Sequence, residues 1–462
     1  MAAASYDFII IGTGQSGKPL ALALGRAGRK TAIIEREYVG GTCINYGCTP
    51  TKTMVASARA AFAARRAGEY GVNAGSVSVD VGKAVARKDA IVQSFRRGGQ
   101  EALEKAENVE LLFGEASVQD KRTVLVKLNE GGERTLSAET IVINTGGSPL
   151  IPPIPGLIDA PVCNSTTIME VSKLPEHLLV LGGGYIALEF GQMFRRLGSR
   201  VSVVEKEAHL VSREDPDVCK EVEEILREDG LELHLGATAV KVETCDDGQI
   251  GLVIKANDGE KTLCGSHLLV AIGRVPNTKE LNLGVAGVET DDKGYIKVNP
   301  KLETSVPGIY AMGDVKGGPA FTHISYDDFR VLRENLVNGG SATVEGRLVP
   351  NTTFIDPQLA SIGLNETEAK RQGRKVRVAK LPMSSVARAI EVSETRGFMK
   401  AIVDAKTDQI LGCTILGIEG GEIMSMIEIA MMGKLPYTAL KEAIFAHPTL
   451  AESLNNLFMT LD

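Results

Sequence analysis

Two cysteines five positions apart, Cys43 and Cys48, are the residues of this chain best suited to chemistry. They lie in the segment Gly-Gly-Thr-Cys-Ile-Asn-Tyr-Gly-Cys-Thr-Pro-Thr-Lys, residues 40–52. Pro50 suits the first turn of a helix, so we expect Cys48 at a helix N-terminus. The helix dipole lowers the pKa of a thiol at that position and makes the thiol a better nucleophile.

The residues alone leave three interpretations of this pair open. A regular helix would separate residues 43 and 48 by about 7.5 Å along its axis, whereas a disulfide needs Cα atoms within about 7 Å. A disulfide would therefore require the segment to bulge, and Gly47 supplies the freedom for that. Alternatively, the pair supplies two of four zinc ligands, although no second Cys/His pair has matching spacing, or the two thiols are unrelated.

A glycine-rich turn, Gly12-Thr13-Gly14-Gln15-Ser16-Gly17, begins the first of two nucleotide-binding patterns. Gly12 permits a tight turn, Gly14 lets a pyrophosphate approach the backbone, and Gly17 lets helix and strand pack closely. Glu35 would accept hydrogen bonds from a ribose. The expected elements around this turn are a strand over 6–12, a helix over 16–27 and a strand over 30–35.

The pattern returns about 170 residues later as Gly182-Gly183-Gly184-Tyr185-Ile186-Ala187. Its expected elements are a strand over 177–181, a helix over 185–197 and a strand over 200–205. Two dinucleotide sites in one chain indicate FAD plus a nicotinamide. Glu205 would bind a ribose 2′-hydroxyl and repel a 2′-phosphate, which favours NADH. Lys206 and His209 leave some use of NADPH open.

Composition narrows the class of protein further. The 462 residues carry a net charge of −7 and are 44% hydrophobic, which excludes a mainly disordered or collagen-like chain. The acidic balance gives no reason to expect nucleic acid or a membrane surface as partner, and no run of 18 apolar residues is present. The apolar stretch at 8–11 is too short for a signal peptide. Seven cysteines, an odd number, argue against a secreted disulfide scaffold, so we expect a cytoplasmic protein in which a disulfide is catalytic or redox-sensing.

Other local patterns are less specific. The spacing of apolar residues predicts helix over residues 51–107, and the prolines of residues 151–155 are expected to interrupt regular structure. After residue 351 we expect a mixture of strands and helices, with a terminal helix from about Leu450. His323 is a weaker site candidate, more simply explained as a histidine of a loop or helix. Five cysteines show no pairing pattern and are interpreted as structural or incidental: Cys163, Cys219, Cys245, Cys264 and Cys413.

The chain resembles the disulfide-dependent flavoprotein oxidoreductases, the class I pyridine nucleotide-disulfide oxidoreductases, which include dihydrolipoamide dehydrogenase, glutathione reductase and mercuric reductase. The cysteine segment is very specific for that family. Further matching segments are Asn-Thr-Gly-Gly-Ser-Pro (144–149), Ala-Ile-Gly-Arg-Val-Pro-Asn (271–277), Tyr-Ala-Met-Gly-Asp (310–314) and His-Pro-Thr-Leu-Ala-Glu (447–452). Pro50-Thr51-Lys52 and the stretch 321–330 look similar to one branch, with mercuric-reductase-like proteins and the copper(II)-reducing flavoprotein of bacterial reactive-chlorine resistance.

This resemblance implies an α/β fold with two Rossmann-like domains and a C-terminal α+β dimerisation domain. The implied divisions are an FAD-binding domain over 1–150, an NAD(P)-binding domain over 151–270, a central domain completing the FAD site over 271–345, and the dimerisation domain over 346–462. The working unit would be a homodimer.

The resemblance also assigns roles to single residues. Cys43 and Cys48 would form a redox-active disulfide that receives electrons from NAD(P)H through FAD. Cys48 would lie beside the flavin, and Cys43 would be the outer thiol that attacks the acceptor. His447 and Glu452 would form a base dyad that reaches the partner subunit's Cys43.

Lys52 would lie near the flavin and pair with Glu189, and Tyr185 would cover the nicotinamide pocket. Asp314 would hold the ribityl chain of FAD. The remaining residues implied to bind FAD are Gly12, Gly14, Gly17, Glu35, Thr42, Thr145 and Gly146. Those implied to bind NAD(P) are Gly182, Gly184, Ile186, Glu205 and Gly273. No resident metal ion is implied.

Two departures from the family pattern bear on the acceptor. The C-terminal tail, residues 457–462, lacks the cysteine pair with which similar mercuric reductases deliver Hg(II), and those enzymes have tyrosine in place of His447. Phe445 stands where lipoamide dehydrogenases usually carry a second histidine. Three functions follow: reduction of Hg(II), Cu(II) or a small disulfide; lipoamide dehydrogenase, with a lipoyl group as partner; or a disulfide redox sensor with slow turnover.

Overall fold

The computed structural model describes residues 4–257 and 259–461 and divides the chain into two compact units. The first comprises Met1–Thr53, Lys83–Leu150 and Gly273–Arg347, and the second comprises Met54–Gly82, Ile151–Ile272 and Leu348–Asp462. The mixed α/β architecture confirms the predicted fold class. The four finer domain boundaries stay a prediction.

A six-stranded sheet forms the centre of the first unit. Its strands are β1 (Ala4–Ile11), β2 (Thr31–Glu35), β3 (Val109–Val118), β4 (Thr123–Leu128), β5 (Glu133–Ile143) and β15 (Ile309–Ala311). In its parallel part the strands follow the order β3-β2-β1-β5-β15. Strand β4 pairs antiparallel with both β3 and β5.

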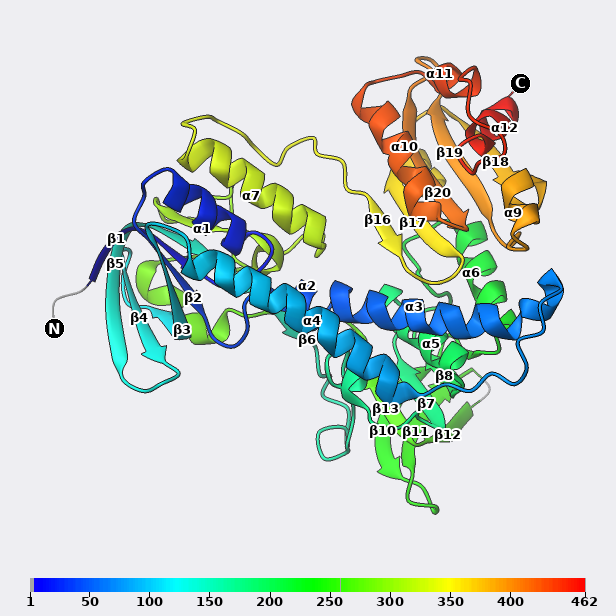
Figure 1. Cartoon of the computed structure of the whole chain (residues 1–462), viewed down its shortest axis with the longest axis horizontal. Helices are drawn as coiled ribbons and strands as arrows, with labels where there is room; N and C mark the ends of the chain where they lie inside the picture. The colour runs from blue at the N-terminus through cyan, green and yellow to red at the C-terminus, as the bar shows by residue number, and fades with distance from the viewer. Residues whose placement is uncertain (1–3, 258, 462) are drawn as a thin grey trace. The chain divides into compact units, whose positions relative to one another are not determined.

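Side chains of β1 are buried on both faces of this sheet, as in parallel sheets covered on each side. Ile9 and Ile11 join one hydrophobic cluster. Phe8 and Ile10 join the other, together with residues of α1 (Gly17–Arg26) and α7 (Thr322–Leu336). Figure 1 shows these two helices side by side next to the sheet. The first glycine-rich turn therefore connects a fully buried strand to a covering helix.

The remaining elements of the first unit lie around this sheet. They are α2 (Gly41–Asn45), β6 (Gly147–Pro149), β14 (Arg274–Pro276) and three 3-10 helices, Lys279–Leu281, Leu283–Ala286 and Gly313–Lys316. Helices α3 (Cys48–Arg65) and α4 (Val81–Glu104) contribute residues to both units. The predicted helical stretch over 51–107 is thus wrong between residues 71 and 80, where Gly71 and Gly75 adopt positive φ angles and no helix forms.

The second unit contains the second nucleotide-binding pattern. Strands β13 (His267–Val270), β7 (His177–Leu181), β8 (Arg200–Val204) and β9 (Glu232–His234) form a parallel sheet in that order. Helices α5 (Tyr185–Leu197) and α6 (Pro216–Glu228) belong to the same region. The predictions for β7 and α5 are confirmed to the residue, and β8 ends one residue before Glu205.

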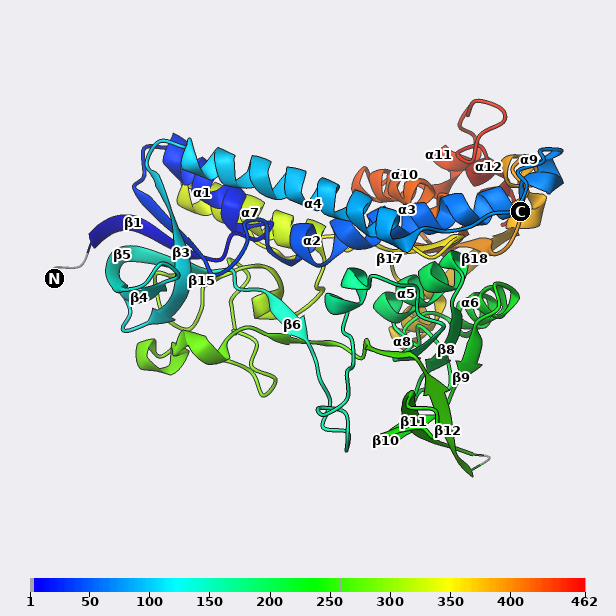
Figure 2. The same cartoon turned by 60° about the horizontal axis from the view of Figure 1, so that its bottom comes forward.

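A three-stranded antiparallel meander adjoins this parallel sheet, with β12 in contact with β7. Its strands are β10 (Thr238–Thr244), β11 (Ile250–Ala256) and β12 (Gly259–Gly265), side by side in Figure 2. A disulfide joins Cys245 and Cys264 here, although the sequence shows no pairing pattern for these two cysteines. The pairing depends on the register of the antiparallel strands, which brings together residues 19 positions apart. The spacing of cysteines along the sequence does not reveal this register.

A five-stranded antiparallel sheet, in the order β16-β17-β20-β19-β18, forms the C-terminal part of the second unit. Its strands are β16 (Asn351–Thr353), β17 (Gln358–Gly363), β18 (Val376–Pro382), β19 (Phe398–Asp404) and β20 (Ile410–Gly417). Its helices are α8 (Glu366–Arg371), α9 (Ala387–Glu391), α10 (Gly420–Met432), α11 (Tyr437–Lys441) and α12 (Ser453–Met459). Helix α10 lies across β17 and β20 (Figure 1). The terminal helix begins at Ser453, three residues later than expected.

A buried ion-pair network links α5 to this C-terminal sheet within the second unit. Arg196 of α5 lies 3.0 Å from the Asp229 carboxylate, and Arg396 lies 2.8 Å from its other oxygen. Asp356, between β16 and β17, also pairs with Arg196. The side chains of Arg196 and Asp229 are each only 4% exposed. Each arginine also has a second carboxylate partner, since Arg396 pairs with Glu394 at 2.6 Å, and Asp229 is the carboxylate that both arginines share.

We therefore expect Asp229→Ala to lower the free energy of unfolding by about 1–3 kcal/mol, because both arginines lose buried hydrogen bonds to their shared carboxylate. Urea unfolding of the two proteins checks this. The matched control is Glu101→Ala, which breaks an exposed ion pair with Lys105 and should leave stability unchanged. Equal stability of Asp229→Ala and the native chain would contradict the assigned importance of the network.

No helix of the described ranges, 4–257 and 259–461, has both the length and the apolar character needed to cross a bilayer.

Candidate functional site

The cysteine segment folds as two short helical pieces with a break between them. Cys43 lies within α2, which ends at Asn45, and Cys48 is the first residue of α3. Gly47 occupies the break, where a Cβ atom would lie 3.0 Å from the Thr42 carbonyl oxygen. Both expectations from the residues are confirmed: the segment departs from a regular helix at Gly47, and Cys48 begins a helix.

The neighbouring Cys48 thiol, through its hydrogen-bonding interaction, raises the pKa of Cys43 above that of an ordinary thiol, and burial raises it further. A hydrogen bond from Thr322 and the charge of Lys52 act in the opposite direction. The pair is present as two thiols and not as a disulfide, so the pairing implied by the resemblance is not formed in this structure and stays a prediction.

Cys48 is the more exposed of the two thiols, and Cys43 is half-buried. The hydroxyl of Thr322, the first residue of α7, lies 3.3 Å from the Cys48 sulfur. Thr322 is a site residue that no sequence pattern indicated. Its neighbour His323, the weaker candidate, stacks on Phe321 with 5.2 Å between ring centroids. The only signal in the sequence was that His323 follows the segment around Asp314.

The cysteine segment is held against the first glycine-rich turn. The Gly40 N–H donates to the Thr13 hydroxyl at 3.1 Å, and the Gln15 amide donates to the Gly40 carbonyl at 3.1 Å. A Cβ atom on Gly41 would lie 2.7 Å from the Gly14 Cα. The first unit therefore brings together the predicted phosphate-binding turn and the two thiols.

The first turn has the shape that a dinucleotide requires. Gly12 has a φ of +105°, and a Cβ atom there would lie 2.3 Å from the Asn144 carbonyl oxygen. A Cβ atom on Gly17 would lie 2.1 Å from the Gly12 carbonyl oxygen. Only glycine fits at either position, and the N-terminus of α1 is left free to face a phosphate. Glu35 accepts a hydrogen bond from the Thr13 hydroxyl at 2.5 Å, beside the turn.

Asp314 and Asn144 strengthen the fit to FAD. Burial raises the pKa of the Asp314 carboxyl, and none of the described residues donates a hydrogen bond to it, so hydroxyl groups of a bound cofactor would satisfy it. Asn144 accepts from the Ser16 hydroxyl at 2.7 Å and donates to the Gly12 carbonyl at 3.2 Å. Asn144 thus fixes the turn, a role that the sequence motifs did not indicate.

Thr145 and Gly146 lie against the segment 271–277. The Thr145 hydroxyl donates to the Asn277 carbonyl at 2.8 Å, and the Asn277 N–H donates to the Gly146 carbonyl at 3.0 Å. Gly273 accepts from the Leu150 N–H at 3.0 Å, and the chain division assigns it to the first unit. Gly273 therefore lies among the residues predicted for FAD, whereas the other residues predicted for NAD(P) lie in the second unit.

The second glycine-rich turn repeats the arrangement of the first. Gly182 has a φ of +117°, with the Ala271 carbonyl oxygen 2.6 Å from the position of a Cβ atom. Gly184 precedes α5, whose first residues are Tyr185 and Ile186. The Glu205 carboxylate lies beside Gly183, where a Cβ atom would be 2.8 Å from it. Glycine turn, helix start and acid are therefore arranged as a nucleotide ribose and pyrophosphate require.

Two further predicted residues lie on α5. Tyr185 is 38% exposed at the start of the helix. Glu189 is buried, and one of its carboxylate oxygens accepts from the Phe354 N–H at 2.8 Å. Lys52 belongs to the other unit, so its pairing with Glu189 stays a prediction.

The predicted base dyad has the geometry of a histidine oriented by a carboxylate. The His447 Nδ1 lies 2.9 Å and 3.1 Å from the two oxygens of Glu452. A carboxylate at Nδ1 favours the tautomer whose Nε2 can accept a proton. The His447 side chain is 67% exposed, so Nε2 is available to a group that approaches from outside the unit.

Comparison with known proteins agrees with this geometry. Residues 6–328 match the family described as pyridine nucleotide-disulphide oxidoreductase, and residues 349–458 match the dimerisation domain of the same family.

Individual relatives cover nearly the whole chain. The chain is 36% identical over 457 residues to a probable pyridine nucleotide-disulfide oxidoreductase, RclA, of Escherichia coli, covering 98% of each chain. The solved Cu(II) complex of that HOCl-induced flavoprotein disulfide reductase superposes with a TM-score of 0.91 at 35% identity, covering 100% of both chains. A mercuric reductase of Staphylococcus aureus is 34% identical over 457 residues, 99% of this chain and 82% of the relative. A dihydrolipoyl dehydrogenase of Chlamydia muridarum is 33% identical over 450 residues, 97% and 95% respectively.

The raised pKa of Cys43 leads to a pH prediction. Because the thiolate forms only above the ordinary thiol range, alkylation of Cys43 by iodoacetamide should keep rising with pH through about pH 9. Cys48→Ser weakens the hydrogen bond that raises this pKa, so labelling at pH 8 should become several-fold faster. Mass spectrometry of the labelled peptide measures both rates. A labelling rate that already levels off at pH 7 would contradict the assignment.

Proposed function

Because the chain belongs to the pyridine nucleotide-disulfide oxidoreductases, a family of FAD- and NAD(P)H-dependent enzymes, we propose that it passes electrons from NADH to a soft metal ion or a small disulfide through Cys43 and Cys48. The observation that carries the proposal is the placement of Cys43 in α2 and Cys48 at the first position of α3, on a segment held against the first glycine-rich turn. The first glycine-rich turn and Asp314 would hold FAD, which would supply electron transfer between the nicotinamide and this pair.

The chain's own residues account for the acceptor half of the reaction. With a small disulfide, the Cys43 thiolate attacks one sulfur, and the first thiolate leaves with a proton. Cys48 then attacks the Cys43 sulfur, which releases the second thiol and forms the Cys43–Cys48 disulfide. With copper, two Cu(II) ions each take one electron, and the two thiols lose two protons. His447, oriented by Glu452, is the proposed acceptor and donor of these protons.

The working unit that we propose is a homodimer. Within the described residues, six large apolar side chains of the C-terminal part are exposed: Ile390, Ile429, Met432, Leu435, Ile444 and Met459. Exposed apolar side chains in a region that matches a dimerisation domain support burial against a second copy. A dimer would also bring the exposed His447 to the partner subunit's cysteine pair, as the resemblance implies.

The acceptor is proposed from the relatives and from the thiols. Soft thiolates bind Hg(II) and copper ions well, and the similar RclA protein has been solved as a Cu(II) complex. A second candidate is lipoamide dehydrogenase, which the His447–Glu452 hydrogen bond favours because that exchange needs a base.

Rapid mixing separates these functions. Holoenzyme reduced anaerobically with NADH is mixed with Cu(II), Hg(II) or lipoamide, and flavin reoxidation is followed. We expect fast reoxidation by the metal ions, abolished in Cys43→Ser. Fast reoxidation by lipoamide alone would favour the second candidate, and slow reoxidation by all three would favour the redox sensor.

His447→Ala should slow reoxidation by lipoamide or another small disulfide by about 10²–10⁴-fold, because the exchange loses its base. Reduction of the flavin by NADH should be unchanged, since the dyad acts on the acceptor side. Stopped-flow absorbance measures both half-reactions. Glu452→Gln should cause a smaller loss in the acceptor half-reaction only. An equal loss in both half-reactions would contradict the proposed role.

Glu205→Ala should reduce the preference for NADH over NADPH at least about tenfold in kcat/KM, because it removes both the ribose contact and the repulsion of a 2′-phosphate. Glu207→Ala is the matched control, since only its backbone N–H contacts Glu205, at 2.9 Å. An unchanged ratio in Glu205→Ala would show that another residue selects the nicotinamide.

A further inference from the structure

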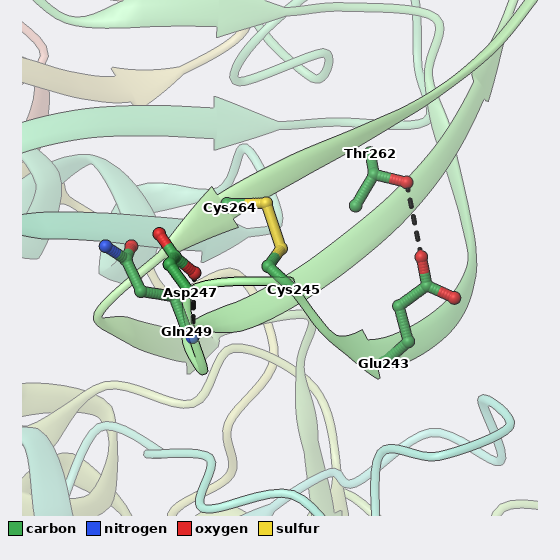
Figure 3. The surroundings of a disulfide bond; sticks show 6 residues. All are labelled: Glu243, Cys245, Asp247, Gln249, Thr262 and Cys264. Carbon is green, nitrogen blue, oxygen red and sulfur yellow. Dashed lines mark hydrogen bonds between the residues drawn. A yellow bond between two sulfur atoms is a disulfide. The ribbon is translucent and has the colours of Figure 1, made fainter.

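The disulfide between Cys245 and Cys264 is outside the proposed electron path. Cys245 follows the last residue of β10, and Cys264 lies on β12, so the bridge passes over the middle strand β11 (Figure 3). Two strands separated by a third lie about 9–10 Å apart, beyond the span of a disulfide. The observed Cα–Cα distance is 6.3 Å, because Cys245 lies beyond the end of its strand, at the first position of a turn.

Gly251 of β11 lies directly beneath the bridge. A Cβ atom on it would be 3.0 Å from the Cys245 sulfur and 3.1 Å from a Thr262 methyl carbon. Glycine is disfavoured inside a strand. Here the absence of a side chain on Gly251 leaves room for the disulfide. A hydrogen bond of 3.4 Å from Thr262 to Glu243 crosses β11 on the same face (Figure 3).

The bridge lies on the solvent side of the meander. Side chains alternate along a strand, and Leu252 and Ile254 of β11 belong to the hydrophobic cluster that also contains Leu179 and Leu268. Gly251 and Cys264 therefore face away from that cluster. Cys264 is exposed and Cys245 is half-exposed. Opening the bridge leaves the core contacts and the strand ladders in place, so both redox states can keep the fold.

We propose that Cys245 and Cys264 form a second, reversible thiol pair that exchanges with small disulfides of positive charge. The exposed Cys264 thiolate attacks the small disulfide and releases one thiol. Cys245 then attacks the Cys264 sulfur, which releases the second thiol and closes the bridge. One small disulfide is reduced to two thiols, and the two protein thiols are oxidised and give up two protons.

The expected charge of the reagent follows from the side chains around the bridge. Four carboxylates lie within four positions of the two cysteines along the chain, namely Glu243, Asp246, Asp247 and Glu260, against two lysines, Lys241 and Lys261. Lys241 is itself paired with Glu243 at 2.8 Å. The local negative charge attracts a cationic disulfide and repels an anionic one.

We expect the closed disulfide to restrict motion of the parallel sheet that contains β7 and β13. Three residues after Cys264 the chain enters β13, which pairs with β7. A cross-link between positions 19 apart restricts the opened states of the meander. Hydrogen exchange at the amides of β11 and β12 should be about tenfold or more faster in the reduced pair than in the bridged pair.

The test uses FAD-loaded protein carrying Cys43→Ser and Cys48→Ser, which removes exchange at that pair and leaves Cys163, Cys219 and Cys413 as the other thiols. After reduction with dithiothreitol and its removal, cystamine or glutathione disulfide is added. We expect the loss of two thiols, a linked Cys245–Cys264 peptide by mass spectrometry, and recovery of both thiols with dithiothreitol in the folded protein. Cystamine should react several-fold faster than glutathione disulfide at low salt, and 1 M salt should reduce that ratio because it screens the carboxylates.

Two further variants make the test specific. Adding Cys245→Ser and Cys264→Ser should abolish the thiol loss. The flavin absorbance and the melting temperature of this variant are measured as controls for folding. Adding Gly251→Val instead keeps both cysteines but fills the space beneath the bridge, so a cysteamine adduct should persist where the bridge fails to close. A bridge that dithiothreitol opens only after denaturation, thiol loss from other cysteines, or faster reaction with glutathione disulfide would overturn the proposal.

Discussion

Cys43 in α2 and Cys48 at the first position of α3 are two nucleophiles close enough that the Cys48 thiol raises the pKa of Cys43. This arrangement depends on the break at Gly47, because a continuous helix would separate the two side chains. The segment before the break rests on the first glycine-rich turn: Gly41 packs against Gly14 too closely for any side chain, and the Gly40 N–H donates to the Thr13 hydroxyl. The geometry of the thiols is therefore tied directly to the proposed cofactor site.

The two nucleotide-binding patterns use one physical arrangement twice. In each, a buried parallel strand ends at a glycine with positive φ, a helix begins within a few residues, and an acid at the end of the next strand lies beside the turn. Free N–H groups at the helix start and the nearby acid provide complementary partners for pyrophosphate and ribose. In the proposed reaction these two turns would hold the two cofactors, and the thiol pair and the His447–Glu452 dyad would provide the exchange chemistry.

The sequence predicted those helices and strands that are determined by residues close together in the chain. The bounds of strand β7 and helix α5 were predicted to the residue. The spacing of apolar residues and the glycine-rich turn between the two elements involve only neighbouring positions. Contacts between distant positions could not be predicted in this way. Thr322 reaches Cys48 across 274 positions, and the Cys245–Cys264 bridge depends on the register of three strands and on the missing side chain of Gly251. The prediction of helix over residues 51–107 was wrong at residues 71–80, where two glycines with positive φ interrupt the helical conformation.

We propose that Cys43 and Cys48 are the two-electron store of this enzyme, with Cys48 beside the flavin. Anaerobic titration of the holoenzyme with NADH, followed by absorbance and by counting alkylated thiols, tests it most directly. We expect the first equivalent of NADH to convert one Cys43–Cys48 disulfide into two thiols and to produce a long-wavelength absorbance band that Cys48→Ser lacks. Bleaching of the flavin by the first equivalent, with no new thiols and no such band, would contradict it.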